Sequence, residues 1–228
     1  MKCEEILKRL KALSDPEAVK GMARYGINTK NNLGVSIYKL RHFAKEIGKA
    51  HELALELWDL GIHDARLLAC FIDDPSKVTG KQMDSWAKDF DSWDICDQAC
   101  TSLFDLNPLA WKKVFEWAER DEEFVKRGAF SLIAGLSVHD KKASDEKFRQ
   151  FVPLIKKHSI DERNYVKKAV NWALRNIGKR NSTLNKNMIR LSKEILKIDS
   201  KTAKWIATDA IRELASEKIQ ERLKRKKH

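Results

Sequence analysis

The chain has 228 residues, 34% of them charged, and its 45 lysines and arginines exceed its 33 acidic residues to give a formal net charge of +12. Nine glycines and four prolines are few for this length, and 43% of the residues are hydrophobic. This composition argues against a disordered chain, a collagen-like sequence and a turn-rich β fold. Apolar runs such as residues 67–72 are far shorter than the roughly 20 residues that cross a bilayer, and residues 1–13 lack the apolar core of a signal peptide, so we expect a cytoplasmic protein.

Amphipathic helices are predicted along the whole chain, because apolar residues recur with a period near 3.6 and almost no segment alternates as a strand would. Start signals support several of them: Asp15 precedes Pro16, Asn107 precedes Pro108, and Ser200 precedes another helix. The sequence therefore predicts an all-α fold of about a dozen helices. In chain order they cover residues 2–13, 16–24, 37–48, 51–60, 63–72, 81–90, 93–104, 108–120, 122–137, 145–157, 162–179, 186–197 and 201–227.

Helix pairs recur every ~35 to 45 residues, without obvious identity between the pairs. This spacing predicts one domain over residues 1–228, an α-solenoid of HEAT-like helical repeats with a basic tail at about residues 219–228. A compact irregular bundle is the alternative. A solenoid would present a concave face, on which such folds bind extended partners.

The positive charge is concentrated in the C-terminal part of the chain. Residues 1–140 contain 20 basic and 23 acidic residues, whereas residues 141–228 contain 25 basic and 10 acidic residues, a net charge of +15. A field of this strength attracts a polyanion. DNA or RNA is the partner expected first, ahead of a membrane surface.

One predicted helix carries cations along a single stripe. Residues 184–198 combine an apolar stripe with a second stripe whose charges all have the same sign, which favours a polyanion-binding face over an ordinary solvated one. The members of this basic stripe are Lys186, Arg190, Lys193 and Lys197.

The helix predicted over residues 162–179 mixes aromatic and basic residues on its polar side. A tryptophan among cations suits a nucleic-acid groove. The alternative is a tryptophan that packs along the stems of the cations or against the next repeat. The residues on this side are Tyr165, Lys168, Trp172, Arg175 and Lys179.

The helix predicted from residue 93 places Trp93 and Asp97 one turn apart on one flank. Asp94 in the first turn can serve the helix dipole, but Asp97 lies too far along the helix for that. One interpretation of Asp97 is a structural ion pair with Arg127 or Lys126. The other is a carboxylate held beside an indole to stabilise a cation.

The four cysteines, Cys3, Cys70, Cys96 and Cys100, lack the density of a disulfide framework and the spacing of a zinc site. We expect reduced and mostly buried thiols, with a redox pair of Cys96 and Cys100 as the alternative to core packing. The six histidines are scattered and no nucleotide-binding, metalloprotease or hydrolase motif is present. We expect no metal or other cofactor.

Five sequence segments carry a family resemblance. In chain order they are residues 22–25, residues 32–41, the helix start Ser-Trp-Asp-x-x-Asp at 92–97, residues 125–127 and the helix that bears Trp172. In this order and spacing they resemble the AlkD family of DNA alkylation-repair glycosylases, over about residues 7–215. Gly128, Ala129 and Phe130, which follow Arg127, depart from the family's pattern.

The resemblance implies HEAT-like repeats whose concave face grips duplex DNA and excises N3- and N7-alkylated purines for base excision repair, with the base left largely stacked and without a cofactor. It also implies a role for each landmark residue. By position, Asp97 matches the catalytic carboxylate, Trp93 and Trp172 match the indoles that cradle the lesion's backbone, Arg127 matches an arginine beside the carboxylate, and Tyr25 matches a tyrosine that helps close the site.

The residue types fit this chemistry. An N3- or N7-alkylated purine already carries a positive charge, so it departs without a proton from a general acid. The remaining task is to stabilise an oxocarbenium-like sugar, for which a carboxylate and electron-rich indole faces are suited. The sequence therefore predicts hydrolysis of the N-glycosidic bond of cationic lesions such as 7-methylguanine and 3-methyladenine.

Duplex DNA is the expected partner, and a monomer without an obligate protein partner is the expected state. A non-catalytic HEAT-repeat scaffold that binds nucleic acid is the alternative, and a protein-interaction solenoid is a third hypothesis. The cations expected to bind DNA are Lys168, Arg175, Lys179, Lys186, Arg190, Lys193 and Lys197.

Overall fold

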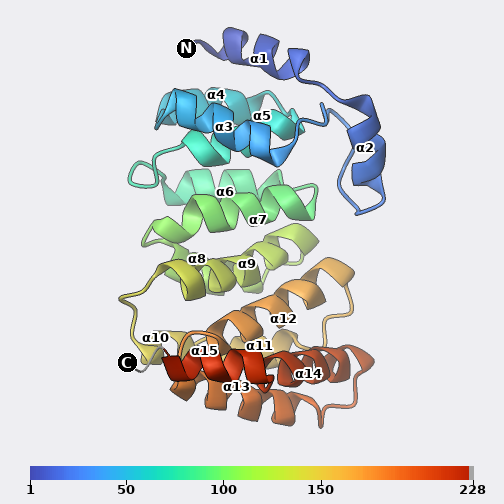
Figure 1. The fold of residues 1–228 in the computed structure, drawn as a ribbon, viewed down its shortest axis with the longest axis vertical. Helices are drawn as coiled ribbons and strands as arrows, with labels where there is room; N and C mark the ends of the chain where they lie inside the picture. Colours follow the sequence, from blue (N-terminus) through green and yellow to red (C-terminus); the bar gives the residue numbers. More distant parts are fainter. Residues whose placement is uncertain (226–228) are drawn as a thin grey trace. The chain divides into compact units, whose positions relative to one another are not determined.

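The computed structural model describes residues 1–225, and all regular secondary structure within them is helical. The all-α class expected from the sequence is confirmed. The chain forms two compact units, Met1–Leu109 and a second unit that begins at Ala110 (Figure 1). The single repeat domain expected from the sequence stays a prediction. None of the helices within residues 1–225 is both long and apolar enough to cross a membrane.

The first unit is built around α5, which packs against α3, α4 and α7, while α1 contacts α4 and α5. Aromatic residues fill its interior: the indoles of Trp58 and Trp86 stack with their ring centroids 3.9 Å apart. Its helices are α1 (Cys3–Ala12), α2 (Pro16–Ala23), α3 (Ile37–Ile47), α4 (His51–Asp59), α5 (His63–Ile72), α6 (Gly80–Lys88), α7 (Trp93–Ser102) and the 3-10 turn η1 (Phe104–Leu106).

Helix α2 buries none of its residues and lies beside the stack of the other helices of this unit (Figure 1). The Asp15 side chain caps its N-terminus by accepting from the Ala18 amide at 3.0 Å. The loop after α2 returns to its start, since the Asp15 amide donates to the Leu33 carbonyl at 2.8 Å. Gly34 there has a φ of +75°, and a Cβ would lie 2.2 Å from the Asp15 carbonyl oxygen, so the turn requires glycine. Loop contacts, rather than a buried face, hold α2.

The second unit contains three neighbouring helices that run in the same direction, α9, α12 and α14. Their direction follows from pairs of bonds in the same order along both helices. Between α9 and α12, Arg127 donates to the Tyr165 carbonyl near the starts, and Asn176 donates to the Ala134 carbonyl further along. Between α12 and α14, Asn171 donates to the Ile206 carbonyl, and Lys179 donates to Glu213 further along. The helices of this unit are α8 (Ala110–Ala118), α9 (Glu123–His139), α10 (Asp145–Arg149), α11 (Val152–His158), α12 (Asn164–Gly178), α13 (Ser182–Ile195), α14 (Lys201–Leu214) and α15 (Glu217–Arg225).

A second layer covers one side of these three helices. Helix α8 packs against α9, α11 packs against α12, and α13 packs against both α12 and α14. The apolar faces of the two layers meet in a core that includes Val170, Leu174, Leu191 and Ile206. Because each layer turns its apolar side toward the other, the exposed sides of α12 and α13 point in opposite directions.

Two helices expected to be continuous are broken. The segment 145–157 forms α10 and α11, because Pro153 lacks an amide hydrogen and sits in the first turn of α11. The segment 201–227 divides after Leu214, where the Gln220 side chain donates to the Leu214 carbonyl at 2.7 Å. The break lets α15 bury Ile219 and Leu223. Part of the expected basic tail is thus a packed helix, and residues 226–228 lie outside the described residues.

Candidate functional site

Helix α7 displays Trp93 and Asp97 on one flank, as the sequence predicts. Trp93 is its first residue and Asp97 follows one turn later, and both side chains are half-buried. The other side of the helix, which includes Cys96 and Cys100, is buried in the core. A carboxylate and an indole thus lie next to each other at the accessible edge of the first unit.

The Trp93 ring is fixed by the chain that follows α2. Its indole Nε1 donates to the Tyr25 carbonyl at 2.9 Å. The Asn28 side chain donates to the Asp91 carboxylate at 2.8 Å, two residues before Trp93. The Tyr25 side chain is 74% exposed. The residue expected to help close the site therefore stands beside Trp93, attached through its backbone.

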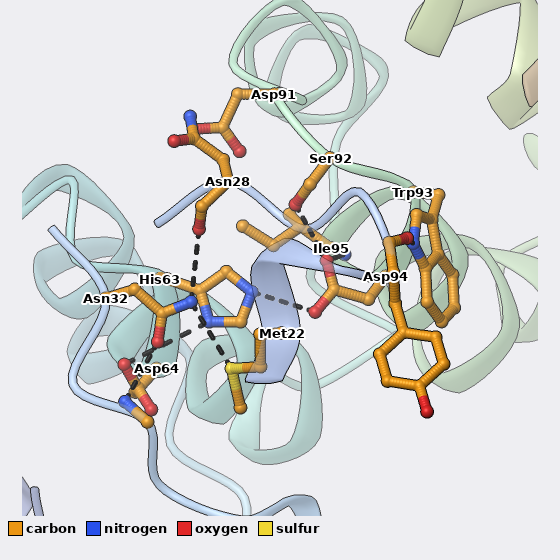
Figure 2. A network of polar contacts seen from close by, with 12 residues as sticks. Met22, Asn28, Asn32, His63, Asp64, Asp91, Ser92, Trp93, Asp94 and Ile95 are labelled. Carbon is orange, nitrogen blue, oxygen red and sulfur yellow. Dashed lines mark hydrogen bonds and ion pairs between the residues drawn. The ribbon is translucent and has the colours of Figure 1, made fainter. Parts of the chain in front are cut away.

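A buried polar network fixes the start of α7 to the start of α5. One oxygen of Asp94 lies 2.8 Å from His63 Nε2, and the other accepts from the Ser92 hydroxyl at 2.7 Å and from the Ile95 amide at 2.9 Å. His63 is 4% exposed. Figure 2 shows its imidazole between the carboxylates of Asp94 and Asp64. Asp94 therefore does more than serve the helix dipole.

Asp64 extends the network to the loop after α2. Its two carboxylate oxygens accept from the Leu33 amide at 2.6 Å and the Val35 amide at 2.7 Å, and the His63 amide donates to the Asn31 carbonyl at 2.9 Å. The loop that holds the Tyr25 backbone against Trp93 is thus clamped at its far end. These bonds give residues 32–35, one of the segments that carry the family resemblance, a structural role.

The network perturbs the protonation of its members. Burial lowers the pKa of His63, but the hydrogen bond and charge of Asp94, together with the charges of Asp64 and Asp91, outweigh it and raise the pKa above the usual 6.5. Burial raises the pKa of Asp94, but the His63 bond and charge, the Ser92 hydroxyl and the Ile95 amide lower it below 3.8. The geometry therefore favours an imidazolium bound to a carboxylate.

His63 and Asp64 were not predicted from the sequence. The signal was weak, because the six histidines are scattered and neither residue belongs to a recognisable motif. A histidine and an aspartate in the first turn of an otherwise apolar helix, residues 63–72, could have indicated a buried polar contact.

In the second unit, the exposed side of α12 carries the aromatic and basic residues expected there. Trp172 is half-buried and Lys168 is exposed. Arg175 and Lys179 both pair with Glu213 on α14, the lysine at 2.8 Å. Two of the three cations expected on this side are therefore partly neutralised within the protein, while Lys168 makes no ion pair with the described residues.

Arg127 is 6% exposed near the start of α9, and its Nη1 donates to the Tyr165 carbonyl at 2.8 Å. The Tyr165 amide in turn donates to the Glu123 carboxylate at 3.2 Å. Arg127 thus helps to fix the first turn of α12, about two helical turns before Trp172.

The basic stripe of α13 is exposed but lies on the other side of this unit. Because the buried residues of α13 face α12 and α14, the stripe points away from the side that bears Trp172. The cations expected to bind DNA are thus divided between two opposite faces. The stripe consists of Lys186, Arg190, Lys193 and Lys197.

The seven tryptophans divide into two groups. Trp58, Trp86 and Trp117 are buried, and Trp111 stacks on Phe151 with ring centroids 5.4 Å apart. The other three lie partly exposed on α7, α12 and α14. The last of these, Trp205, was not predicted from the sequence. It is 44% exposed and follows Lys201 and Lys204, so its helix mixes aromatic and basic residues as the helix of Trp172 does.

The cysteines and potential metal ligands have no arrangement that indicates further chemistry. None of the four cysteines, all of which lie within residues 1–225, forms a disulfide. Cys70, Cys96 and Cys100 are buried, and burial raises the pKa of Cys70 and Cys100. The expected core packing of these three residues is confirmed. Within residues 1–225, no group of three or more histidine, cysteine or acidic side chains is placed to hold a metal ion.

The layered helix pairs define the class of protein as an all-helical, HEAT-like repeat protein. A solved structure supports the fold: it belongs to a family of proteins related to the HEAT-like repeat DNA glycosylases with affinity for branched DNA structures. It matches with a TM-score of 0.77 at 21% identity, over 93% of this chain and 95% of that chain.

The family follows from the sequence itself. The sequence model described as DNA alkylation repair enzyme matches residues 6–214, so the chain belongs to that family. No curated protein gave a significant match. A designed armadillo repeat protein in complex with the peptide (KR)4 matches with a TM-score of 0.36 at 14% identity, over 82% of this chain and 88% of that chain, which is too weak to support a conclusion.

Proposed function

We propose that the protein is a DNA glycosylase that hydrolyses the N-glycosidic bond of cationic N3- and N7-alkylated purines in duplex DNA. The observation that carries this proposal is the flank of α7, where Asp97 follows Trp93 by one turn and the first turn of the helix is anchored by the buried Asp94–His63 pair. Membership of the DNA alkylation repair enzyme family supports it.

Asp97 supplies the charge that the reaction needs. As the bond between C1′ and the purine breaks, both bonding electrons leave with the base, whose positive charge they neutralise, and the sugar becomes oxocarbenium-like. A carboxylate near C1′ stabilises that cation and orients the water that attacks C1′. The proton lost by this water passes to solvent. A neutral base lacks this advantage, because it must acquire a proton before it leaves.

The two indoles assist by different means. Trp93 is held by its bond to the Tyr25 carbonyl, so its ring is oriented before DNA binds. Trp172 offers a half-buried ring among the cations of α12. An indole face near a desolvated cation contributes on the order of 1 to 2 kcal/mol. We assign both rings to the deoxyribose and its flanking phosphates.

Tyr25 and Arg127 are assigned supporting roles. Tyr25 is exposed beside Trp93 and closes the edge of the site. Arg127 is buried and bound to the Tyr165 carbonyl, which suits a residue that positions α12 and adds positive potential for a flanking phosphate.

DNA binding is assigned first to the side of α12 that bears Trp172, through Lys168, Arg175 and Lys179. The basic stripe of α13 points the other way, so its part is to strengthen the field that attracts DNA rather than to contact the same duplex segment. The members of that stripe are Lys186, Arg190, Lys193 and Lys197.

The alternative function is a non-catalytic HEAT-repeat scaffold for nucleic acid. It is favoured by the structural neighbour, whose family is described as having affinity for branched DNA structures. A scaffold needs the exposed cations and aromatic rings, but it does not need a carboxylate next to Trp93.

The experiment that separates the two functions measures released bases. The protein is incubated with duplex DNA methylated by a simple alkylating agent, and the free bases are analysed by chromatography. We expect release of 7-methylguanine and 3-methyladenine, and almost none of uracil or hypoxanthine from duplexes that contain those neutral bases. Binding without release of any base would favour the scaffold.

A further inference from the structure

The exposed side of α14 carries a tryptophan among cations. Trp205 is 44% exposed, and the Lys167 ammonium from α12 lies 5.8 Å from its ring centroid. Lys201, one turn before Trp205, and Lys204, the residue directly before it, are also exposed. The ring therefore has one ammonium near it and is partly open to solvent, and the same helix carries two further exposed lysines.

Trp205 lies on the same side of the second unit as Trp172. Helices α12 and α14 are parallel neighbours, joined by the bond from Asn171 to the Ile206 carbonyl at 3.1 Å and by the Lys179–Glu213 pair at 2.8 Å. Each helix buries its apolar side against α13. At 100° per residue, Trp172 and Trp205 both project opposite those buried sides.

The charge around Trp205 remains positive after the internal ion pairs are taken into account. On α14, Lys204 pairs with Asp199 at 3.0 Å and Arg212 pairs with Asp209. Lys167, Lys168 and Lys201 make no ion pair with the described residues. These three lysines belong to α12 and α14, the helices that carry Trp172 and Trp205, and their charge complements a polyanion.

An intact duplex makes poor use of this arrangement. Its bases are stacked inside the helix, so it offers phosphates to the lysines but no base face to an exposed indole. An unpaired nucleotide offers both, because its base stacks on an aromatic ring while its phosphate binds cations. A ring that is this exposed within a cationic surface is therefore suited to a base outside the duplex.

We propose that Trp205, with Lys167 and Lys201, binds an unpaired nucleotide of DNA. The base stacks on the indole, and the adjoining phosphate contacts the two amines. This subsite rests on the proposed function only in taking DNA as the ligand, and it needs no base excision. It would direct the protein to duplexes that carry a single-stranded extension, a gap or a branch.

The test compares two DNA ligands by fluorescence anisotropy: a blunt duplex and the same duplex with a short thymidine extension. We expect the wild type to bind the extended duplex about tenfold more tightly, the effect typical of one stacked base. Trp205→Ala should abolish this preference, whereas Trp205→Phe should keep most of it. Lys167→Ala with Lys201→Ala should reduce the salt dependence for the extended duplex only.

Matched controls separate stacking from folding and from duplex contacts. Phe115→Ala removes a ring of similar exposure, 41%, from α8 in the other layer, and should leave both affinities unchanged. Trp172→Ala should weaken binding of both ligands. Circular dichroism and thermal melting should show that Trp205→Ala is as folded as the wild type.

Three results would overturn the subsite. The wild type could bind both duplexes equally, Trp205→Ala could keep the preference for the extended duplex, or Trp205→Ala could lose the same affinity for both duplexes. A dimer in sedimentation that dissociates in Trp205→Ala would assign the ring to a second copy instead. Failure of the glycosylase proposal would leave the preference for the extended duplex intact, and base release from a blunt duplex should not change in Trp205→Ala.

Discussion

The start of α7 and the exposed side of α12 both gather candidate functional residues, but different forces hold them. At α7, buried groups fix the backbone: Asp94 and His63 pair at 2.8 Å, and their side chains are 15% and 3% exposed. At α12, the cations lie at the surface, where Arg175 and Lys179 share Glu213 and Lys168 is exposed. Buried polar pairs impose geometry, whereas surface charges supply a field that salt screens. Under the proposed function, the first unit would supply the fixed geometry that chemistry needs, and the second would supply the field that attracts DNA.

The largest effect is expected from breaking the buried pair. Asp94→Ala leaves the buried His63 without its partner and removes the acceptor of the Ile95 amide, so it should lower the free energy of unfolding by about 3 to 5 kcal/mol. Urea denaturation measures this change. Asp94→Asn, which keeps the shape, should cost less.

Glu46→Ala is the control for this variant, because it breaks the exposed Arg9–Glu46 pair of the same unit. It should have a far smaller effect. Equal losses in Glu46→Ala and Asp94→Ala would contradict the view that burial makes the α7 network rigid.

A smaller effect is expected at the DNA-binding surface. Lys168→Glu should weaken duplex binding roughly tenfold at 0.15 M salt, since one phosphate contact becomes a repulsion. Arg190→Glu with Lys193→Glu changes two charges on the opposite layer and should weaken binding less, because the Debye length is only about 8 Å at this ionic strength.

Titration of duplex with each variant checks the order of these affinities. If the double variant on α13 loses more affinity than Lys168→Glu, the duplex lies against α13, and the assignment to α12 is wrong.

The smallest effect concerns pH. The folded protein raises the pKa of His63 above 6.5, so the stabilisation from the protonated imidazole is fully present below 6.5 and is lost as the pH rises through the folded pKa. His158 acts with the opposite sign, because burial and the Lys126 charge lower its pKa. The wild type should therefore lose stability relative to His63→Asn as the pH rises above 6.5.

Unfolding curves of both proteins at several pH values measure this difference. A constant difference between them would show that His63 does not change its protonation in the folded state over that range.

The fold was predictable where local signals agree with packing. The helix over residues 63–72 was predicted with the bounds of α5, and the expected caps Asp15 and Ser200 accept from the Ala18 and Ala203 amides. The break after Arg149 was missed although Pro153 signals it in the sequence. The break after Leu214 has no such signal and depends on the contact of Gln220 with the Leu214 carbonyl.

The candidate site was only partly predictable, for a related reason. Trp93 and Asp97 share a flank of one helix, which spacing alone reveals. His63, Asp64 and Asp94 act through contacts between helices some thirty residues apart in the chain, and no periodicity shows them. The direction in which the exposed side of α12 or α13 points likewise depends on the layer that each helix joins. The expected cations could therefore be found from the sequence, but they could not be assigned to one surface.

The central claim is that the Asp97 carboxylate drives the loss of a cationic base, and one substitution tests it. Asp97→Asn keeps the shape of the side chain and removes its charge. Under single-turnover conditions on a duplex with one 7-methylguanine, excision should slow by about 10²-fold or more, the effect of losing a strong electrostatic contact in the transition state, while DNA affinity stays the same or rises. Excision of 7-methylguanine by Asp97→Asn at the wild-type rate would contradict this account.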